Sequence, residues 1–333
     1  MARLWFLTKI KLFSVCLYLF VLLIISASAT EAEEEYRAWP GEFMRMGAGA
    51  KAMGMGNAYT TVEGDIYSSY FNPAGLAAME GRALSLSINY LSMDRKLMYL
   101  AYGSRIGPDA DFALSWIQSG TDDIQGRDLN GNPTGSLSDS RNAFTLSFSK
   151  NLNKYLSIGL NSKFSLWKLG GEDAKSFGFD LGVIARPVKN LALSFVSRDI
   201  KSRYTWKSGY WGEKIGGSDG QPLEKTDKFP IYYTLGAAYK TLGEKLLIST
   251  TLESVQDNPL GLNAGVSYDI HDRFAVRGGI YNYTSSDELG SGSMTLGFTI
   301  QLTGSASFDY AYVPDDFDGN SIHMISFDMF YGE

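Results

Sequence analysis

Short segments in which apolar and polar residues alternate follow one another through most of the chain. The clearest covers residues 155–167, where Leu156 and Ile158 begin a series of apolar positions separated by small or polar ones. Residues 177–186 and 260–270 repeat the pattern. Because side chains point to opposite faces along a strand, each segment predicts a β-strand with one apolar and one polar face.

About fourteen such segments can be counted from the alternation. They cover residues 84–90, 96–102, 112–118, 142–149, 155–167, 177–186, 190–198, 230–240, 245–253, 260–270, 273–281, 293–301, 305–313 and 321–331.

The connections between these segments alternate in length. Short turns such as 150–154 and 187–189 alternate with longer loops such as 119–141 and 199–229. Bacterial membrane barrels sort their connections in this way, whereas a soluble β-sandwich has no reason to do so. We therefore predict an all-β fold, a transmembrane antiparallel β-barrel that occupies residues 84–333.

Residues 30–83 lack the alternation and have a different composition. They hold a stretch rich in glycine and methionine and then a turn sequence, with the candidate positions Gly47, Gly49, Gly54, Gly56, Asn72, Pro73, Ala74 and Gly75. Small residues allow backbones to approach closely, and Asn-Pro-Ala-Gly is typical of a turn. An apolar segment ahead of a barrel with a polar lumen fits best inside it, so we predict an acidic leader followed by an N-terminal plug.

Residues 1–29 have the pattern of a secretory signal peptide. Arg3, Lys9 and Lys11 precede an apolar run over residues 12–25, and small residues follow at 27–29. The run is shorter than the roughly 20 residues of a membrane-spanning helix, which favours a cleaved signal over a retained anchor. We expect an exported chain located in the bacterial outer membrane.

The composition supports a membrane barrel and excludes several other classes. The chain has 20 Tyr, 19 Phe and 36 Gly, an enrichment typical of transmembrane barrels. Its net charge of −6 argues against nucleic-acid binding. Its single cysteine, Cys16, lies in the predicted signal, so we expect no disulfide and no thiol chemistry after cleavage.

Candidate chemistry is sparse. There are two histidines, His271 in a predicted turn and His323 at the start of the last strand, and we expect no catalytic residue, metal site or cofactor. The loop 199–229 is rich in aromatic residues, which are either a contact surface for a partner or an extension of the interfacial aromatic girdle. Its candidate positions are Tyr204, Trp206, Tyr210 and Trp211.

Two stretches resemble a known family. Residues 44–77 read MRMGAGAKAMGMGNAYTTVEGDIYSSYFNPAGLA and resemble the N-terminal signature of the PorV/PorQ family, within the FadL-like barrels. Residues 308–331 read FDYAYVPDDFDGNSIHMISFDMFY and are similar to the family's last hairpin. Met324 departs from the basic residue that the resemblance leads us to expect after His323.

The resemblance implies a fourteen-stranded barrel with a plug that holds the Asn-Pro-Ala turn. It also implies two alternative functions, neither of them enzymatic. The first is a plugged conduit for small hydrophobic molecules. The second is a protein-interaction barrel of a type IX secretion system, in which the aromatic loop 199–229 contacts secreted proteins.

Overall fold

The computed structural model describes residues 39–332 except 92–94, 129, 209–222, 256–259, 285–290 and 315–320. The predicted signal peptide and acidic leader, together with Tyr210 and Trp211 of the aromatic loop, lie outside the described residues.

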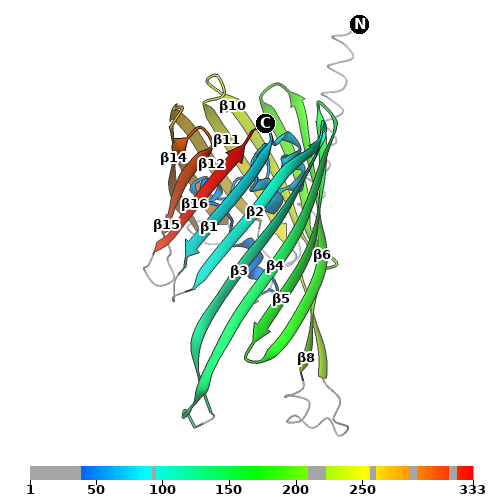
Figure 1. Ribbon diagram of the computed structural model, residues 1–333, viewed down its shortest axis with the longest axis vertical. Coiled ribbons are helices and arrows are strands. Elements are labelled where there is room, and N and C mark those ends of the chain that lie inside the picture. Colours follow the sequence, from blue (N-terminus) through cyan, green and yellow to red (C-terminus); the bar gives the residue numbers. More distant parts are fainter. Residues whose placement is uncertain are drawn as a thin grey trace.

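The described residues form sixteen antiparallel strands in one sheet that closes on itself (Figure 1). The strands are β1 (Arg82–Tyr90), β2 (Lys96–Gly107), β3 (Ala110–Arg127), β4 (Pro133–Asn153), β5 (Leu156–Leu169), β6 (Glu172–Val188), β7 (Leu191–Ile200), β8 (Arg203–Ser208), β9 (Leu223–Lys228), β10 (Tyr232–Thr241), β11 (Leu246–Val255), β12 (Gly261–His271), β13 (Phe274–Thr284), β14 (Ser291–Thr303), β15 (Ala306–Pro314) and β16 (Ser321–Tyr331). The first and last strands pair from Arg82↔Tyr331 to Tyr90↔His323, which closes the barrel.

Two of the sixteen strands are continuations of their neighbours, so the wall contains fourteen strands, as predicted. The chain leaves β7 at Asp199 and Lys201, both with φ 61°, and resumes as β8. β9 and β10 are separated in a similar way. Pro230 lies in the break between them and has no backbone N–H to donate to a ladder of hydrogen bonds. The pairing of β6 passes from β7 to β8 across this break.

The long connections contain more strand than the sequence predicted. Most of the predicted loop 119–141 extends β3 and β4, and residues 203–208 and 223–228 of the predicted loop 199–229 form the paired strands β8 and β9. These extensions lie beyond the apolar zone of the barrel, where neither face of a strand has to be apolar. Backbone pairing therefore continues after the alternation has ended. We call this the long-hairpin end and the opposite end, which carries the C-terminus, the short-turn end (Figure 1).

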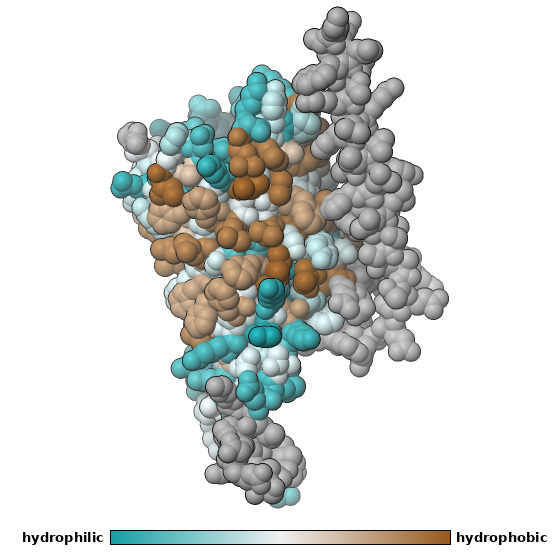
Figure 2. Space-filling view, turned by 90° about the vertical axis from the view of Figure 1, so that its right-hand side faces the viewer, coloured by the Kyte–Doolittle hydropathy of each residue, from teal (hydrophilic) through white to brown (hydrophobic). Residues whose placement is uncertain are grey.

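The barrel is inside out compared with a soluble domain. In β1 the lumen-facing Ser85, Ser87 and Asn89 are buried, whereas Leu86 on the outer face is 41% exposed. Figure 2 shows hydrophobic side chains gathered over the middle of the barrel and hydrophilic ones towards its ends. A polar lumen and an apolar outer belt are the distribution that a lipid-embedded barrel requires.

Residues 39–81 lie inside this wall and form the predicted plug. The plug contains four short helical segments, η1 (Glu42–Arg45), α2 (Ala50–Gly54), α3 (Ser68–Phe71) and η2 (Pro73–Ala78). No helix among the described residues is both long and apolar enough to cross a membrane.

Candidate functional site

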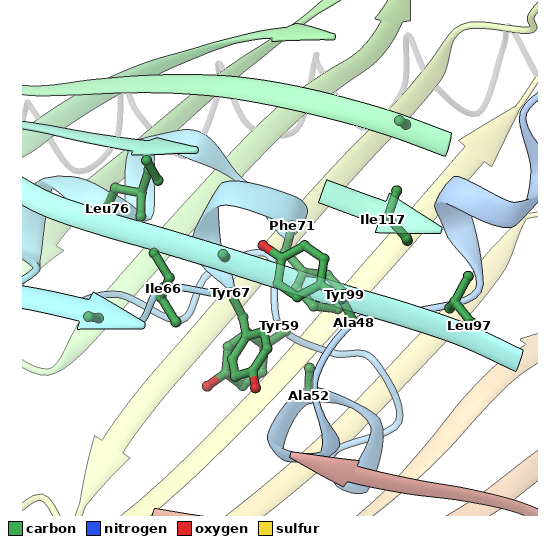
Figure 3. Packing of buried hydrophobic residues seen from close by; sticks show 14 of the residues in the cluster. Ala48, Ala52, Tyr59, Ile66, Tyr67, Phe71, Leu76, Leu97, Tyr99 and Ile117 are labelled. Atoms are coloured by element: carbon green, nitrogen blue, oxygen red, sulfur yellow. The ribbon is translucent and has the colours of Figure 1, made fainter. Parts of the chain in front are cut away.

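The plug packs around a buried group of aromatic residues in the lumen (Figure 3). Tyr59 and Phe71 come from the plug, with ring centroids 5.5 Å apart. Tyr67, also of the plug, lies 5.8 Å from Tyr99 of β2. The tyrosine hydroxyls bond to polar groups of the wall and the plug, so this core joins the two rather than filling the plug alone. One such bond links Tyr99 to Ser69 over 2.7 Å.

The end of α2 packs against glycines of the wall. Met55 and Gly56 contact the backbone at Gly265 and Gly279, which are paired residues of β12 and β13. A methyl group at either wall glycine would overlap the backbone of the plug. Gly54 faces Gly297 of β14, and a methyl group at Gly56 would overlap the backbone at Ile280, so both surfaces must be free of side chains for this approach.

A buried ion cluster fixes α2 to the last strands. The ammonium group of Lys51 lies 2.6 Å from Asp328 of β16, 3.9 Å from Asp309 of β15 and 3.7 Å from Asp65 of the plug. Arg277 of β13 lies 3.7 Å from Asp309 and adds a second cation. All of these side chains are shielded from solvent, so each charge depends on its partners.

The same carboxylates govern the ionisation of Lys51. Burial alone disfavours the charged ammonium group. The opposing attraction of Asp328, Asp65 and Asp309 outweighs it and holds the pKa of Lys51 above its usual range. The Lys51 ammonium group, which fixes α2 to the wall, therefore stays charged through the physiological pH range.

The predicted turn at Asn72 lies against the other side of the barrel. The Asn72 side chain accepts a hydrogen bond from the N–H of Ala74 at 3.1 Å and donates one to the carbonyl of Thr60 at 2.8 Å. Pro73 begins η2 directly after it. Asn72 thus caps η2 and ties the turn to a neighbouring segment of the plug.

The turn occupies a notch made by two glycines of the wall, which the sequence did not reveal as site residues. Gly159 of β5 and Gly182 of β6 are paired and face the lumen. A methyl group at Gly159 would overlap the backbone at Pro73 and Ala74, and one at Gly182 would overlap the Asn72 amide. A glycine at a lumen-facing position within a strand was the available signal.

The other candidate glycines act within the plug. Gly47 and Gly49 have φ values of 95° and 82°, a region that favours glycine, and both lie immediately before α2. Gly47 donates its N–H to the Tyr70 hydroxyl at 2.9 Å. Gly75 packs against Ser68 and Val62, where an added methyl group would be too close.

A small cavity lies on the long-hairpin side of the turn, and we call it the inner cavity. Its volume is about 30 Å³, and polar and charged residues of β5, β6 and β7 make up much of its lining. Those residues are Asn161, Lys163, Asp180, Arg198 and Asp199. The Nε of Arg198 and the Oδ1 of Asn161 are buried there without a hydrogen-bond partner among the described residues.

A larger opening of about 440 Å³ lies on the short-turn side of the turn. We call it the vestibule. Plug residues 61–63 and strands β6, β7 and β10 line it, and its cations are Lys154, Arg186, Lys189 and Lys240. Arg186 forms an ion pair with Glu63 of the plug, with one Nε–Oε2 distance of 3.1 Å.

Of the candidate aromatic residues, Tyr204 is fully buried, so it is not available as an exposed contact. It packs with Trp167 and Phe229 in an aromatic cluster at the long-hairpin end, because the β8–β9 hairpin folds this face towards the lumen. Trp206 lies beside it, is partly exposed and donates its N–H to Asp227 at 2.8 Å.

Both histidines form hydrogen bonds to groups of the wall. The Nδ1 of His323 lies 2.7 Å from the Tyr310 hydroxyl, and the Nδ1 of His271 accepts a hydrogen bond from the N–H of Arg273 at 3.2 Å. Within the described part of the chain, no group of three or more His, Cys, Asp or Glu side chains is placed to hold a metal ion. The acidic segment 315–320 lies outside the described residues.

Comparison with known proteins gives structural matches only. No family model and no curated protein sequence matches the chain. The toluene transporter TbuX of Ralstonia pickettii matches with a TM-score of 0.61 and 14% identity over 86% of this chain and 98% of its own. The Pseudomonas putida toluene transporter TodX gives 0.61 and 14% over 86% and 99%.

A FadL homologue of Pseudomonas aeruginosa matches with a TM-score of 0.57 and 14% identity, over 85% of this chain and 98% of its own. The matched length is nearly the whole of each solved chain. The protein therefore shares the closed fourteen-stranded barrel fold of these solved structures.

Proposed function

We propose that the protein is an outer-membrane conduit for small hydrophobic molecules, closed by its plug. The observation that carries the proposal is a polar lumen closed by residues 39–81, with a space on each side of the Asn72 turn. The apolar outer belt supports a membrane location, and the shared fold with toluene transporters supports a hydrophobic cargo. By the usual orientation of such barrels, the long-hairpin end faces outside and the short-turn end faces the periplasm.

The plug has to move for the conduit to open. The inner cavity has a volume of about 30 Å³, which is room for only about two water molecules at ~15 Å³ each. Toluene is several times larger than water, so no such solute passes the Asn72 turn in this arrangement. The structure therefore corresponds to a closed state.

Uptake by living cells tests this proposal. Cells that lack their own hydrophobic-solute transporter would express the protein or an empty vector, and the initial uptake of radiolabelled toluene and naphthalene would be compared. Cell fractionation and a heat-dependent gel shift would establish that the barrel is folded in the outer membrane. We expect faster uptake with the protein, and equal rates with a folded barrel would exclude the conduit.

We also propose membership of the PorV/PorQ group, on the signature at residues 44–77. The structure supports a role for this signature in the plug, since Gly54, Gly56 and the Asn-Pro-Ala turn lie against the backbone of the wall. We propose no catalytic role for any residue.

A secretion partner remains the second hypothesis, and the partly exposed Trp206 at the long-hairpin end is its best-placed contact residue. Purification from the native membrane, followed by identification of bound proteins, tests it.

A further inference from the structure

The inner cavity and the vestibule lie along the same part of the wall. Both are bordered by β6 and β7; β5 lines the inner cavity, and the turn that precedes β5 lines the vestibule. On β6 the inner cavity reaches Asp180 and the vestibule begins at Arg186, roughly 20 Å apart along the strand at about 3.3 Å per residue. Between them, at Gly182, the wall carries the Asn72 turn.

We infer, on the basis of the proposed function, that the turn Asn72–Gly75 is the moving gate, while α2 remains fixed to the wall. Displacement of this turn from the notch at Gly159 and Gly182 joins the inner cavity to the vestibule. Permeation then follows the β5–β6–β7 wall, and the opposite side of the lumen stays closed.

The two halves of the plug are held by different kinds of contact. On the gate side, Arg198 donates to the carbonyl of Phe71 at 2.9 Å and Asn161 donates to that of Ser69 at 2.9 Å. Thr61 bonds to Ser194 over 2.7 Å. The acceptors here are neutral, although Arg198 is itself a buried cation, and the adjoining cavities have room for water to replace the lost bonds. The buried Arg45–Asp199 ion pair beside the inner cavity joins η1, and not the turn, to β7, so displacement of the turn leaves it in place.

On the anchor side, movement of α2 would separate buried opposite charges. Lys51 and Asp328 are 2.6 Å apart, and their side chains are 11% and 1% exposed. A buried charge that loses its partner is far more costly than a neutral hydrogen bond that water can replace. The gate side is therefore the part of the plug that opens first.

The Glu63–Arg186 ion pair does not overturn this order, although it lies on the gate side. Both side chains border the vestibule and are 17% and 23% exposed. Water in the vestibule can hydrate both charged groups when they separate. The pair is a weak latch at the short-turn end of the gate.

Pairs of engineered cysteines test which half moves. The only cysteine of the chain is Cys16 in the predicted signal, so no native thiol of the barrel interferes. Ala74 and Ala192 share one buried cluster on the gate side, and Ala50 and Ala311 share another on the anchor side. The gate tether is Ala74→Cys with Ala192→Cys, and the matched anchor tether is Ala50→Cys with Ala311→Cys.

Toluene uptake would be measured for each tether before and after oxidation, with disulfide formation verified by mass. We expect oxidation of the gate tether to reduce uptake about tenfold, equivalent to ~1.4 kcal/mol. Oxidation of the anchor tether should leave uptake unchanged. The opposite result would overturn the gate assignment while leaving the conduit itself intact.

Hydrogen exchange of the unmodified protein in detergent gives an independent readout that requires no transport. We expect backbone amides of residues 72–78 to exchange about tenfold faster than those of residues 50–56, because local opening controls exchange. Equal or reversed rates would overturn the assignment. If the unmodified barrel carries no solute at all, the proposed function fails and the exchange rates still decide which half of the plug opens.

Discussion

The hydroxyl of Tyr67 donates a hydrogen bond to the carboxylate of Asp328 at 2.8 Å, across 261 residues of sequence. Tyr67 belongs to the plug and Asp328 to β16, the last strand of the wall. Ser85 of β1 bonds to both groups and is paired with Asp328 across the closing seam. One plug residue therefore bridges the first and last strands at the point where the barrel closes.

Removal of the Lys51 charge, which lies beside Asp328 at this seam, should destabilise the closed barrel. Lys51→Met leaves Asp328 buried without its nearest positive charge, and we expect a loss of about 3–5 kcal/mol in stability. The temperature at which the folded form disappears on a gel should fall accordingly. Lys225→Met is the matched control, because the Lys225 side chain is 78% exposed and its ion pair with Asp227 contributes little.

A second substitution identifies the cause. If the loss comes from the unpaired carboxylate, Asp328→Asn should restore much of the stability of Lys51→Met. A double variant that is weaker than Lys51→Met alone would contradict the electrostatic explanation.

An added methyl group in the gate notch should push the turn out of its place. Gly159→Ala would place Cβ against the backbone at Pro73 and Ala74, which has no flexible side chain to move aside. We expect a loss of about 1–3 kcal/mol and faster solute entry in the absence of any trigger. Entry of a normally excluded dye into cells, together with thermal unfolding, measures both effects.

Gly304→Ala is the matched control for the notch. Gly304 has no atom within 4 Å of an added Cβ. Dye entry should therefore remain at the unmodified level. Increased entry with both variants would point to general weakening of the barrel instead of displacement of the turn.

The wall was largely predictable from the sequence, because lipid demands an apolar residue at every second position of each strand. All fourteen predicted strands are confirmed. The β8–β9 hairpin and the extensions of β3 and β4 were missed, since strands outside the apolar belt carry no alternation. The breaks at Asp199 and Pro230 separate β7 from β8 and β9 from β10. The alternation alone does not reveal these breaks.

The plug was predictable as a segment but not in its contacts. Its glycines and the Asn72 turn were visible in the sequence, whereas Gly159 and Gly182 could be recognised only once the register of β5 and β6 was known. The pairing of Lys51 with Asp328 depends on how a closed barrel brings distant strands around one helix. No local pattern contains that information.

The Glu63–Arg186 ion pair, which we call the latch, should affect opening of the plug more than stability of the barrel. Glu63→Gln removes the charge that pairs with Arg186, and we expect faster uptake with a change in stability of about 0–1 kcal/mol, because both partners are partly exposed. Glu244→Gln is the control, since Glu244 also borders the vestibule but belongs to a turn of the wall. Equal effects of the two variants on uptake would indicate a general role of vestibule charge and no latch.

The tip of the β3–β4 hairpin provides a pH-dependent marker for the long-hairpin end. The Asn132 side chain donates to the carboxylate of Asp128 at 3.0 Å, and the backbone N–H groups of Asn130 and Asn132 donate to it at 2.8 Å. These bonds favour the charged form and lower the pKa of Asp128 below its usual value. The turn therefore has its full stabilisation above the unfolded pKa of about 3.9 and loses it as the pH falls through the lower folded value.

We expect the nitrogen-15 shifts of the Asn130 and Asn132 amides to stay constant from neutral pH down to about pH 5 and then to change with a midpoint below ~3.9. Asp128→Asn should abolish the transition, because the amide does not titrate in this range. A midpoint above the usual value would mean that the carboxylate is not held by these donors. The plug resonances should show no change at the same midpoint, since Asp128 is exposed and its hydrogen bonds to the described residues stay within the hairpin tip.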